Sequence, residues 1–380
     1  MSIEIKSVKS QKDLRQFINF NYELYKDSKY NVPYLFFDEK NTLNKDKNAA
    51  FEFCDAEYLM AFKEGRMVGR VAAIINNKAN EKWKMKAVRF GWLDFIDDAE
   101  VSEALLRAVE KYGKQHGMDT VVGPLGFTDL DREGMLIDGF EEMGNMYTNY
   151  NFPYYPKHLE SLGFAKDYDY IESVINIPDR IPDKFLKIAN IARTRYNLQT
   201  YKPTREELLK KGFAKAIFDN INITYKDLFG YSELSDRQIE QYVSSYIGSA
   251  DTNLVVVIVD ANEDNKVVGF GISFPSFAKA LQHTRKGRLF PFGWWHLLKA
   301  LKLHQTDDVD LLLIGVLPEY RIKGANALIF CDLLGKYIEY GFKCAHAMPQ
   351  LETNEIALSS WNYFDARPYR RRRCYTKEIK

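Results

Sequence analysis

The sequence has few of the features that mark exported, membrane-spanning or metal-binding proteins. It contains four cysteines, at positions 54, 331, 344 and 374, with no Cys-x-x-Cys pair and no zinc-binding spacing, so we expect neither disulfides nor a structural metal. The first residues lack the apolar core of a signal peptide, and no apolar run approaches the roughly 18 residues of a membrane-spanning helix. These absences predict a cytoplasmic protein with reduced thiols.

The chain also lacks an excess of charge of either sign. Its 53 basic and 52 acidic residues give a net charge of +1, which provides no overall attraction for nucleic acid. With 380 residues, it is longer than one ordinary domain. We therefore expect two domains and no nucleic-acid partner, so that any anionic ligand must be bound by a local group of residues.

The same order of predicted elements occurs twice along the chain. Each half contains a strand, a helix, a hairpin, a central strand, a helix and a strand, and the second half also contains helices predicted at 206–228 and 236–247. Prolines in the stretch 178–182 interrupt regular structure between the halves. We therefore predict an α/β protein with two tandem domains, residues 1–178 and 179–380.

Near the C-terminus, an apolar strand runs into a glycine-containing turn and then a helix. The strand is predicted at 310–316 and the helix at 325–340, and the turn between them contains Arg321 and Gly324. The first N–H groups of a helix have no intrahelical acceptor, so an anionic phosphate can bind there, and a guanidinium beside them suits a diphosphate. The alternative is an ordinary turn with a surface arginine. The preceding apolar strand and hairpin favour a phosphate site.

This turn resembles the pyrophosphate turn of the GNAT (GCN5-related) N-acyltransferases, in which Arg or Gln is followed by two residues, Gly, one residue and then Gly or Ala. Arg321 and Gly324 match that pattern, whereas Asn326 stands at the last position. The whole chain is similar to bacterial tandem-GNAT proteins, some of which are associated with ceramide synthesis, with matching features at Gly123–Phe127 and in the Tyr-Tyr-Pro stretch 154–156. The resemblance implies that each half is a mixed, mostly antiparallel sheet flanked by helices.

The resemblance also implies what the second half binds. The donor would be acyl-CoA or an acyl-phosphopantetheine thioester, the latter presented by an acyl carrier protein, and no metal is involved. Backbone N–H groups in the turn would hold the phosphates and the end of the strand would hold the pantetheine arm. The residues implied are Val316, Leu317, Arg321, Ile322, Lys323, Gly324, Ala325 and Asn326.

The first half has the GNAT order of elements but no matching phosphate turn. After its central strand at 88–95, Asp97 and Asp98 stand where the phosphates of a cofactor would lie, and like charges repel. We therefore interpret residues 1–178 as a degenerate GNAT-like domain with a structural or acceptor-binding role, and residues 179–380 as the domain with the acyl-thioester site.

Acyl transfer to an amine requires a group that accepts the amine proton. Glu352 is the preferred base if it faces the cleft, because desolvation there would raise its pKa; the alternative is a solvated loop carboxylate. His346 lies in an apolar run and is either a second candidate or a core histidine. In the GNAT closing motif, a tyrosine acts as the general acid for the leaving thiolate. Trp361 stands at that position here, and Tyr363 is the nearest replacement.

The connection at 276–306 is long and contains basic residues without one acidic residue. Phe290, Trp294 and Trp295 are interleaved with these bases, and apolar residues recur at helical spacing from Trp294 to Leu303. A basic amphipathic helix with tryptophans suits a membrane surface or a lid over an apolar substrate, whereas the alternative is a helix packed on the core. We expect peripheral contact with the inner membrane through Phe290, Trp294 and Trp295.

The run Arg370–Arg373 is predicted as an edge strand with two arginines on each face, one pair of which is available to phosphates or to an acidic carrier protein. Together with the resemblance, the sequence predicts an N-acyltransferase that moves an acyl group from acyl-CoA or a carrier thioester to an amine. A lipidic amine is the preferred acceptor, and the resemblance implies a sphingoid amine within that class. The alternative is a non-catalytic CoA-binding or scaffold protein with a GNAT-derived fold.

Overall fold

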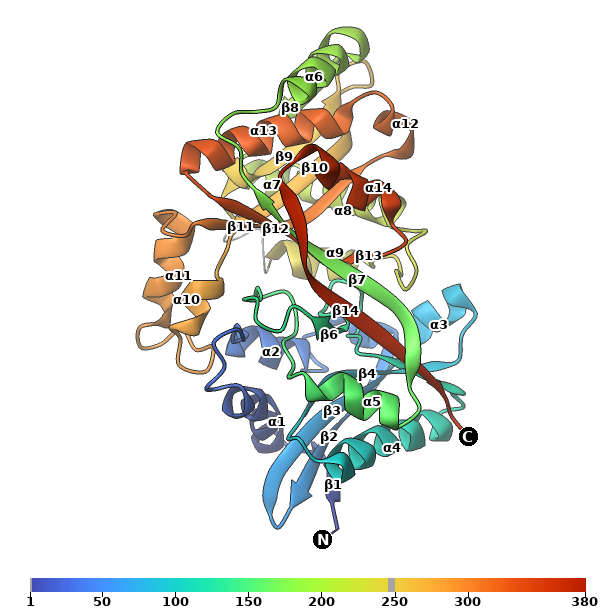
Figure 1. Ribbon diagram of the computed structural model, residues 1–380. Helices are drawn as coiled ribbons and strands as arrows, with labels where there is room; N and C mark the ends of the chain where they lie inside the picture. The colour runs from blue at the N-terminus through green and yellow to red at the C-terminus, as the bar shows by residue number, and fades with distance from the viewer. Residues whose placement is uncertain (1, 245–249) are drawn as a thin grey trace.

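The computed structural model describes residues 2–244 and 250–380. Within these ranges, the strands form one 14-stranded mixed sheet with the order β1-β2-β3-β4-β5-β14-β7-β12-β11-β10-β9-β8, from which β6 and β13 branch. The two halves of the chain lie at opposite ends of this sheet, and the long strands β7 and β14 cross from one to the other (Figure 1). The mixed α/β architecture with flanking helices agrees with the predicted fold class.

The first half forms the lower part of Figure 1. Helix α4 begins where the Asp98 carboxylate accepts a hydrogen bond from the Glu100 N–H, and its apolar residues at helical spacing pack on β3 and β4. The elements are β1 Glu4–Ser7, α1 Gln11–Leu24, α2 Phe36–Thr42, the 3₁₀ helix Ala49–Glu52, β2 Cys54–Lys63, β3 Arg66–Asn76, α3 Asn77–Trp83, β4 Ala87–Phe95, α4 Ala99–Gln115, β5 Thr120–Gly123, β6 Met135–Asp138, α5 Tyr154–Ser161 and β7 Ala165–Asn176.

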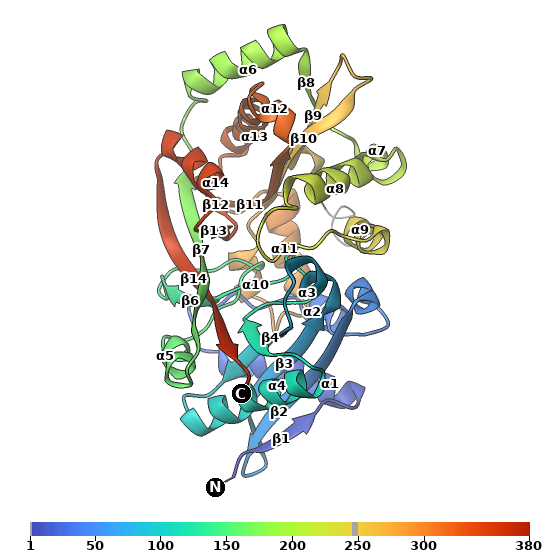
Figure 2. The same ribbon diagram turned by 90° about the vertical axis from the view of Figure 1, so that its right-hand side faces the viewer.

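The second half repeats this arrangement, and α13 packs between α6 and the strands β8–β10 (Figure 2). Its elements are α6 Asp183–Tyr196, β8 Leu198–Tyr201, α7 Arg205–Lys210, α8 Phe213–Thr224, α9 Asp236–Tyr242, the 3₁₀ helix Thr252–Leu254, β9 Val255–Asp260, β10 Lys266–Pro275, α10 Ala278–Gln282, α11 Gly293–Lys302, β11 Asp308–Val316, α12 Pro318–Arg321, α13 Ala325–Tyr340, β12 Cys344–Ala347, β13 Gln350–Leu351, α14 Glu355–Ser359, the 3₁₀ helix Ser360–Tyr363 and β14 Ala366–Glu378.

Two predicted helices of the second half differ from the structure. The helix expected at 206–228 is divided into α7 and α8 at Gly212, whose φ of +80° is a left-handed conformation that interrupts a right-handed helix. The helix expected at 236–247 begins as predicted, but α9 ends at Tyr242 and residues 245–247 lie outside the described ranges. None of the helices in the described ranges combines the length and apolar character that crossing a membrane requires.

The halves exchange their final strands. Strand β14 enters the sheet of the first half between β5 and β7, and β7 in turn pairs with β12 of the second half. The prediction of an edge strand at Arg370–Arg373 is therefore wrong, because β14 is paired on both sides. The division at residue 178 stays a prediction, since each half of the sheet contains a strand from the other half of the chain.

The arginines of β14 point alternately to the two faces of the sheet, as the strand period requires. Arg370 and Arg372 are buried against Glu172 of β7, whereas Arg371 and Arg373 pair with Asp169. These arginines thus bind carboxylates of the protein itself, in place of the phosphates or carrier protein that we expected.

Candidate functional site

The central strands of the second half diverge and open a cavity between them. Strands β11 and β12 pair in parallel from Asp308 opposite Cys344 to Leu311 opposite Ala347, and β11 then continues to Val316 after β12 has ended. A cavity of about 410 Å³ lies at this divergence, within the size range of roughly 300–1,000 Å³ that is common for ligand pockets.

Most of the cavity wall is apolar. Residues of β11 and β12 form one side, α8 and the segment after it form another, and α13 and the segment around Trp361 close the remainder. The Tyr225 hydroxyl, at the end of α8, donates a hydrogen bond of 3.1 Å to the Ile314 carbonyl. The apolar side chains include Leu311, Leu313, Ile314, Ile217, Phe218, Leu228, Phe330, Leu333, Leu334, Trp361 and Phe364. Such a wall suits an aliphatic chain.

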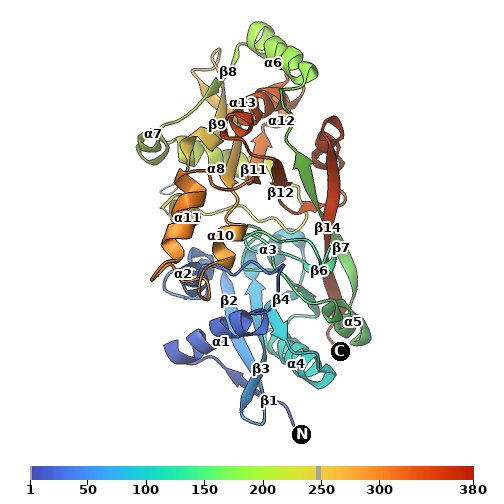
Figure 3. The same cartoon turned by 60° about the vertical axis from the view of Figure 1, so that its left-hand side comes forward.

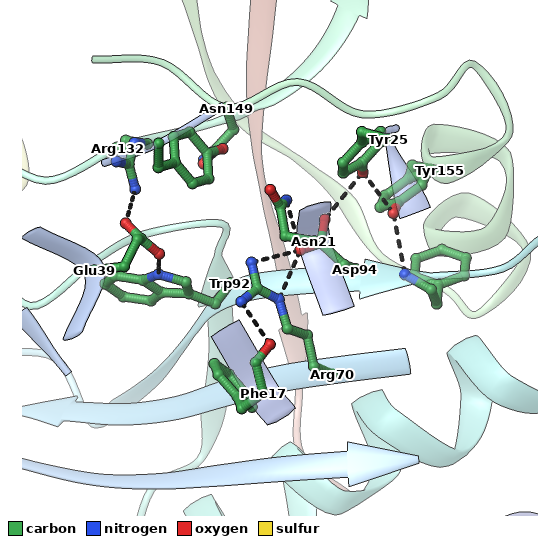
Figure 4. A network of polar contacts seen from close by, with 12 residues as sticks. Phe17, Asn21, Tyr25, Glu39, Arg70, Trp92, Asp94, Arg132, Asn149 and Tyr155 are labelled. Carbon is green, nitrogen blue, oxygen red and sulfur yellow. Dashed lines mark hydrogen bonds and ion pairs between the residues drawn. The ribbon is translucent and has the colours of Figure 1, made fainter. Parts of the chain in front are cut away.

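The polar end of the cavity comes from the first half of the chain. Asp129, Asp131 and Glu133, in the loop between β5 and β6, line it. Arg132 of the same loop pairs with Glu39 of α2 at 2.6 Å, and the other oxygen of Glu39 accepts a hydrogen bond from Trp92 (Figure 4). The loop is therefore held by contacts within the first half, while its carboxyl groups line the cavity of the second half.

Enclosure by protein raises the pKa values of these carboxyl groups, although the cavity leaves them partly accessible. Burial raises the pKa of Asp129 to about 7, while Arg89 opposes the shift. Burial and the neighbouring Asp129 charge raise the pKa of Glu133 well above its ordinary value, and the Tyr170 hydroxyl, which is hydrogen bonded to it, opposes the rise. Asp129 and Glu133 are therefore protonated to a larger extent at neutral pH than ordinary carboxyl groups.

The predicted phosphate turn lies between α12 and α13. The N–H groups of Ile322 and Lys323 donate to the Tyr320 carbonyl, whereas within the described ranges those of Gly324, Ala325 and Asn326 donate to no backbone carbonyl. Of the turn residues 322–326, which are predicted to hold the phosphates, Gly324, Ala325 and Asn326 therefore have free N–H groups. They lie at the N-terminus of a 16-residue helix, where the partial positive charge favours an anion.

Gly324 allows this turn to form. Its φ of +84° is a left-handed conformation, and an added Cβ would lie 2.9 Å from Cγ2 of Ile188 in α6. The Arg321 Nε donates to the Val316 carbonyl at 3.2 Å, which orients the guanidinium beside the turn. Val316 and Leu317 are buried, and the Leu317 N–H donates to the Val268 carbonyl at 2.9 Å.

Glu352 lies away from the position that we expected. It pairs with Lys166 at 2.6 Å and with Arg371 at 2.5 Å, and it is not among the residues that line the cavity. The hydrogen bond from Lys166 lowers the pKa of Glu352, although burial opposes this. A carboxylate held in ion pairs is a poorer proton acceptor, and the role of Glu352 as the base stays a prediction.

The other two predicted catalytic residues also lie outside the cavity lining. His346 alternates on β12 with Ala345 and Ala347, which line the cavity, and its Nε2 lies 3.9 Å from Asp308. Although burial acts to lower the pKa of His346, the neighbouring Asp308 and Asp310 carboxyl groups raise it. The Tyr363 ring is 53% exposed and lies 3.8 Å from Lys184 Nζ. The roles of Glu352, His346 and Tyr363 stay predictions.

The residue pattern along the chain does not single out Asp129, Asp131 or Glu133 as functional groups. A usable signal is present, because acidic residues occupy the alternate positions 129, 131 and 133 in the loop that follows β5. Their importance depends on the opposite half of the molecule, which no local pattern identifies.

The corresponding cleft of the first half is nearly filled. Strands β4 and β5 also pair in parallel over three residue pairs, and the cavity there is about 20 Å³. A buried network occupies this region, in which Arg70 pairs with Asp94 at 2.7 Å and both Asn21 and Tyr25 donate to the Asp94 carboxylate at 3.0 Å (Figure 4). The interpretation of the first half as a degenerate domain stays a prediction.

Comparisons of sequence find two informative relatives, while no family model matches the chain. The chain is 26% identical over 382 residues to protein YghO of Escherichia coli (strain K12), which covers 99% of this chain and 95% of that protein. It is 24% identical over 318 residues to the bacterial ceramide synthase of Caulobacter vibrioides (strain NA1000 / CB15N), which covers 83% of this chain and 80% of that protein.

Comparisons of structure identify the fold. A tandem GNAT protein from the clavulanic acid biosynthesis pathway superposes with a TM-score of 0.54 at 12% identity, covering 100% of this chain and 99% of that one. The GCN5-related glucosamine N-acetyltransferase region of a fungal β-N-acetylglucosaminidase gives a TM-score of 0.53 at 13% identity, covering 99% of this chain and 38% of that one. The predicted tandem GNAT fold is confirmed.

Proposed function

We propose that this chain, which has the tandem GNAT fold, is an N-acyltransferase that moves an acyl group from acyl-CoA or an acyl-phosphopantetheine thioester to an amine. The observation that carries the proposal is the apolar cavity at the divergence of β11 and β12, in the same half as the free N–H groups at the start of α13. In the first half, the corresponding cleft is too small for a ligand.

The donor is bound by its phosphates at the turn. The N–H groups of Gly324, Ala325 and Asn326 and the guanidinium of Arg321 meet the diphosphate, and the pantetheine arm then follows β11 towards the cavity. An amine attacks the thioester carbonyl directly, without a covalent enzyme intermediate, because holding both reactants together removes most of the entropic barrier. CoA and a carrier protein remain alternative sources of the same phosphopantetheine group.

A lipidic amine is the acceptor that we prefer. The cavity wall is apolar over most of its area, and its charged residues are carboxyl groups that suit an ammonium group. The similarity to the ceramide synthase of Caulobacter vibrioides supports a sphingoid amine within that class.

Peripheral contact with a lipid surface belongs to this proposal. Phe290 and Phe292 are 78% and 74% exposed, and Trp294 and Trp295 of α11 are more than 40% exposed. Helices α10 and α11 lie along one side of the molecule beside α2 (Figure 3). No described residue of 276–306 lines the cavity, which argues against a lid role for this insertion and favours a surface role.

Calorimetric titration with CoA and an assay of thiol release from decanoyl-CoA with a long-chain amine test the proposal. Arg321→Glu should weaken CoA binding by roughly 30-fold or more, because a cation at the diphosphate is replaced by an anion. Arg66→Glu, on an exposed hairpin of the first half, is the matched control and should bind as the wild type does. Absence of CoA binding to the wild type would refute the proposal.

Binding without turnover would favour the second candidate, a non-catalytic CoA-binding or scaffold protein. The observation in its favour is the closing segment, where Trp361 stands in place of an acidic tyrosine and Tyr363 is exposed. Transfer to any amine would exclude it.

A further inference from the structure

We propose that the first half of the chain completes the acceptor site with a carboxyl pair, Asp129 and Glu133, which receives the ammonium group of an aliphatic amine and takes up its proton. This inference rests on the proposed acyltransferase function, and it names both the base and the class of acceptor. The first half would then contribute to catalysis without binding a cofactor of its own.

Charge within the cavity is of one sign. Among the described residues that line it, Asp129, Asp131 and Glu133 are the charged ones, and all of them are acidic. Every other lining residue is apolar or uncharged. A ligand that fills the cavity and satisfies these groups therefore combines an aliphatic body with a cationic end, which describes a long-chain primary ammonium ion.

Of the three carboxyl groups, Asp129 and Glu133 are the ones available to contact a ligand in the cavity. Asp131 accepts a hydrogen bond of 3.0 Å from the Thr128 N–H, and its side chain lies against Gly126, where an added Cβ would be 2.2 Å from the Asp131 Cβ. Asp131 therefore shapes the loop. Asp129 accepts a hydrogen bond of 3.0 Å from the Ser232 N–H of the second half, so the carboxyl pair is held from both halves at once.

The loop that carries the pair is rigidly supported. The Arg132 guanidinium lies 3.4 Å from the centre of the Tyr34 ring and pairs with Glu39. The Gly134 N–H donates to the Pro124 carbonyl at 2.8 Å, which closes the base of the loop. Support of this kind fixes the position of a reactive carboxyl group, as proton transfer requires.

The acid–base properties of the site match the proton that has to move. An alkylammonium ion has an ordinary pKa near that of lysine, about 10, and loss of hydration in an apolar cavity lowers it. Burial raises the pKa of Asp129 to about 7, so the two values approach each other. The positive charges of Arg89 and Lys82 keep the pKa of Asp129 from rising further.

The step is balanced as follows. The ammonium group gives one proton to the Asp129 carboxylate and becomes an amine with a free electron pair. The nitrogen attacks the thioester carbonyl carbon, the C–N bond forms and the C–S bond breaks. The thiolate leaves with the electron pair of that bond and takes the second nitrogen proton, which gives an amide and a free thiol. The proton on Asp129 is released to solvent.

Two probes of equal chain length test the inference in the full-length protein. Calorimetric titration with dodecylamine and with dodecanol separates recognition of the ammonium group from recognition of the chain. Asp129→Asn should weaken dodecylamine binding at pH 7 by roughly tenfold or more and leave dodecanol binding unchanged, whereas Glu133→Gln replaces a largely protonated group and should have a smaller effect. Glu141→Gln, an exposed residue of the first half, is the matched control and should change neither.

Kinetics provide the second readout. Transfer from decanoyl-CoA to dodecylamine by the wild type should fall as the pH decreases through about 7, and Asp129→Asn should lose roughly 100-fold in rate together with this pH dependence. Equal dodecylamine affinity and an unchanged pH profile in both variants would overturn the inference while leaving the acyltransferase proposal intact. A wild type that binds dodecylamine but transfers no acyl group would overturn the proposed function and leave the ammonium site standing.

Discussion

The carboxylate of Glu172 in β7 lies between Arg370 and Arg372 of β14, and all three side chains are shielded from solvent. Arg370 Nη1 is 3.6 Å from one carboxylate oxygen, and Arg372 Nε pairs with the other. Although burial acts to raise the pKa of Glu172, the two guanidinium groups hold it below its ordinary value. This pairing holds β14, the C-terminal strand, against β7.

Removal of Glu172 should therefore destabilise the protein strongly. Glu172→Ala leaves two buried guanidinium groups without their anion, and we expect a loss of about 3–5 kcal/mol in the free energy of unfolding, measured with urea. Glu142→Ala removes the exposed partner of Arg367 and should cost less than about 1 kcal/mol. Equal losses in the two variants would contradict the role of this buried pairing.

Narrowing the cavity should weaken binding of the aliphatic chain and leave CoA binding at the proposed phosphate turn unchanged. Ala347→Phe places a ring in the space at the end of β12, which corresponds to several methylene groups worth about 0.8 kcal/mol each. We expect dodecylamine affinity to fall roughly tenfold or more in calorimetry, with CoA affinity unchanged. Ala165→Phe, at an exposed position, is the control. Unaltered dodecylamine binding would place the chain elsewhere.

The stability of the protein should fall between acid and neutral pH because of Asp310. Its side chain is completely buried and neither oxygen makes a hydrogen bond of normal geometry, although Ser276 is close enough to moderate its pKa. Burial raises the pKa of Asp310 to about 7. The folded protein therefore keeps a proton that the unfolded chain releases above about 4, and the free energy of unfolding decreases as the pH rises to about 7.

Chemical unfolding at pH 5 and pH 8 measures this effect. The Asp310 contribution amounts to about 2–3 kcal/mol over that interval, and Asp310→Asn should remove it. His346, whose pKa is raised by Asp308 and Asp310, adds a decrease of the same sign, which should become smaller in the variant because the Asp310 charge is absent. Asp307→Asn, on the nearby surface, should retain the wild-type difference. An identical difference in Asp310→Asn would show that Asp310 ionises normally.

Binding to anionic vesicles should depend on the exposed rings of α11. The double variant Trp294→Ser, Trp295→Ser should reduce co-sedimentation with phosphatidylglycerol vesicles by roughly tenfold or more. The reason is that the two rings that would insert into the lipid surface near Lys299 and Lys302 are removed. High salt should weaken the wild-type binding as well. Ile191→Ser removes a similarly exposed apolar residue in α6, which lies at the top of Figure 1 and away from α11, and is the control. Equal sedimentation of all variants would exclude α11 as a membrane contact.

Local features of the fold followed from local patterns. The bounds of α13 agree with the prediction because apolar periodicity and flanking glycines act within a few residues. The turn before α13 was predictable for the same reason, since Gly324 adopts the left-handed conformation that its residue type favours. Gly212 was overlooked, and a single helix was predicted where two occur.

The candidate base was not predictable in this way. Glu352 was preferred because it lies close in sequence to the strand beside the cleft, but Lys166 and Arg371, which are distant in sequence, pair with it. Asp129 and Glu133 were overlooked as functional groups because the cavity that raises their pKa values belongs to the other half. Long-range pairing decides which carboxyl groups are neutralised by cations and which face a cavity.

The sequence by itself determined the two successions of strands and helices, the small-residue turn before α13 and the basic, aromatic insertion, because each depends on neighbours along the chain. Only the tertiary structure decided that β7 and β14 change places between the halves and that an acidic loop of one half closes the cavity of the other. The physical reason is that strand pairing and desolvation act between residues that are close in space, and the sequence order leaves that proximity open.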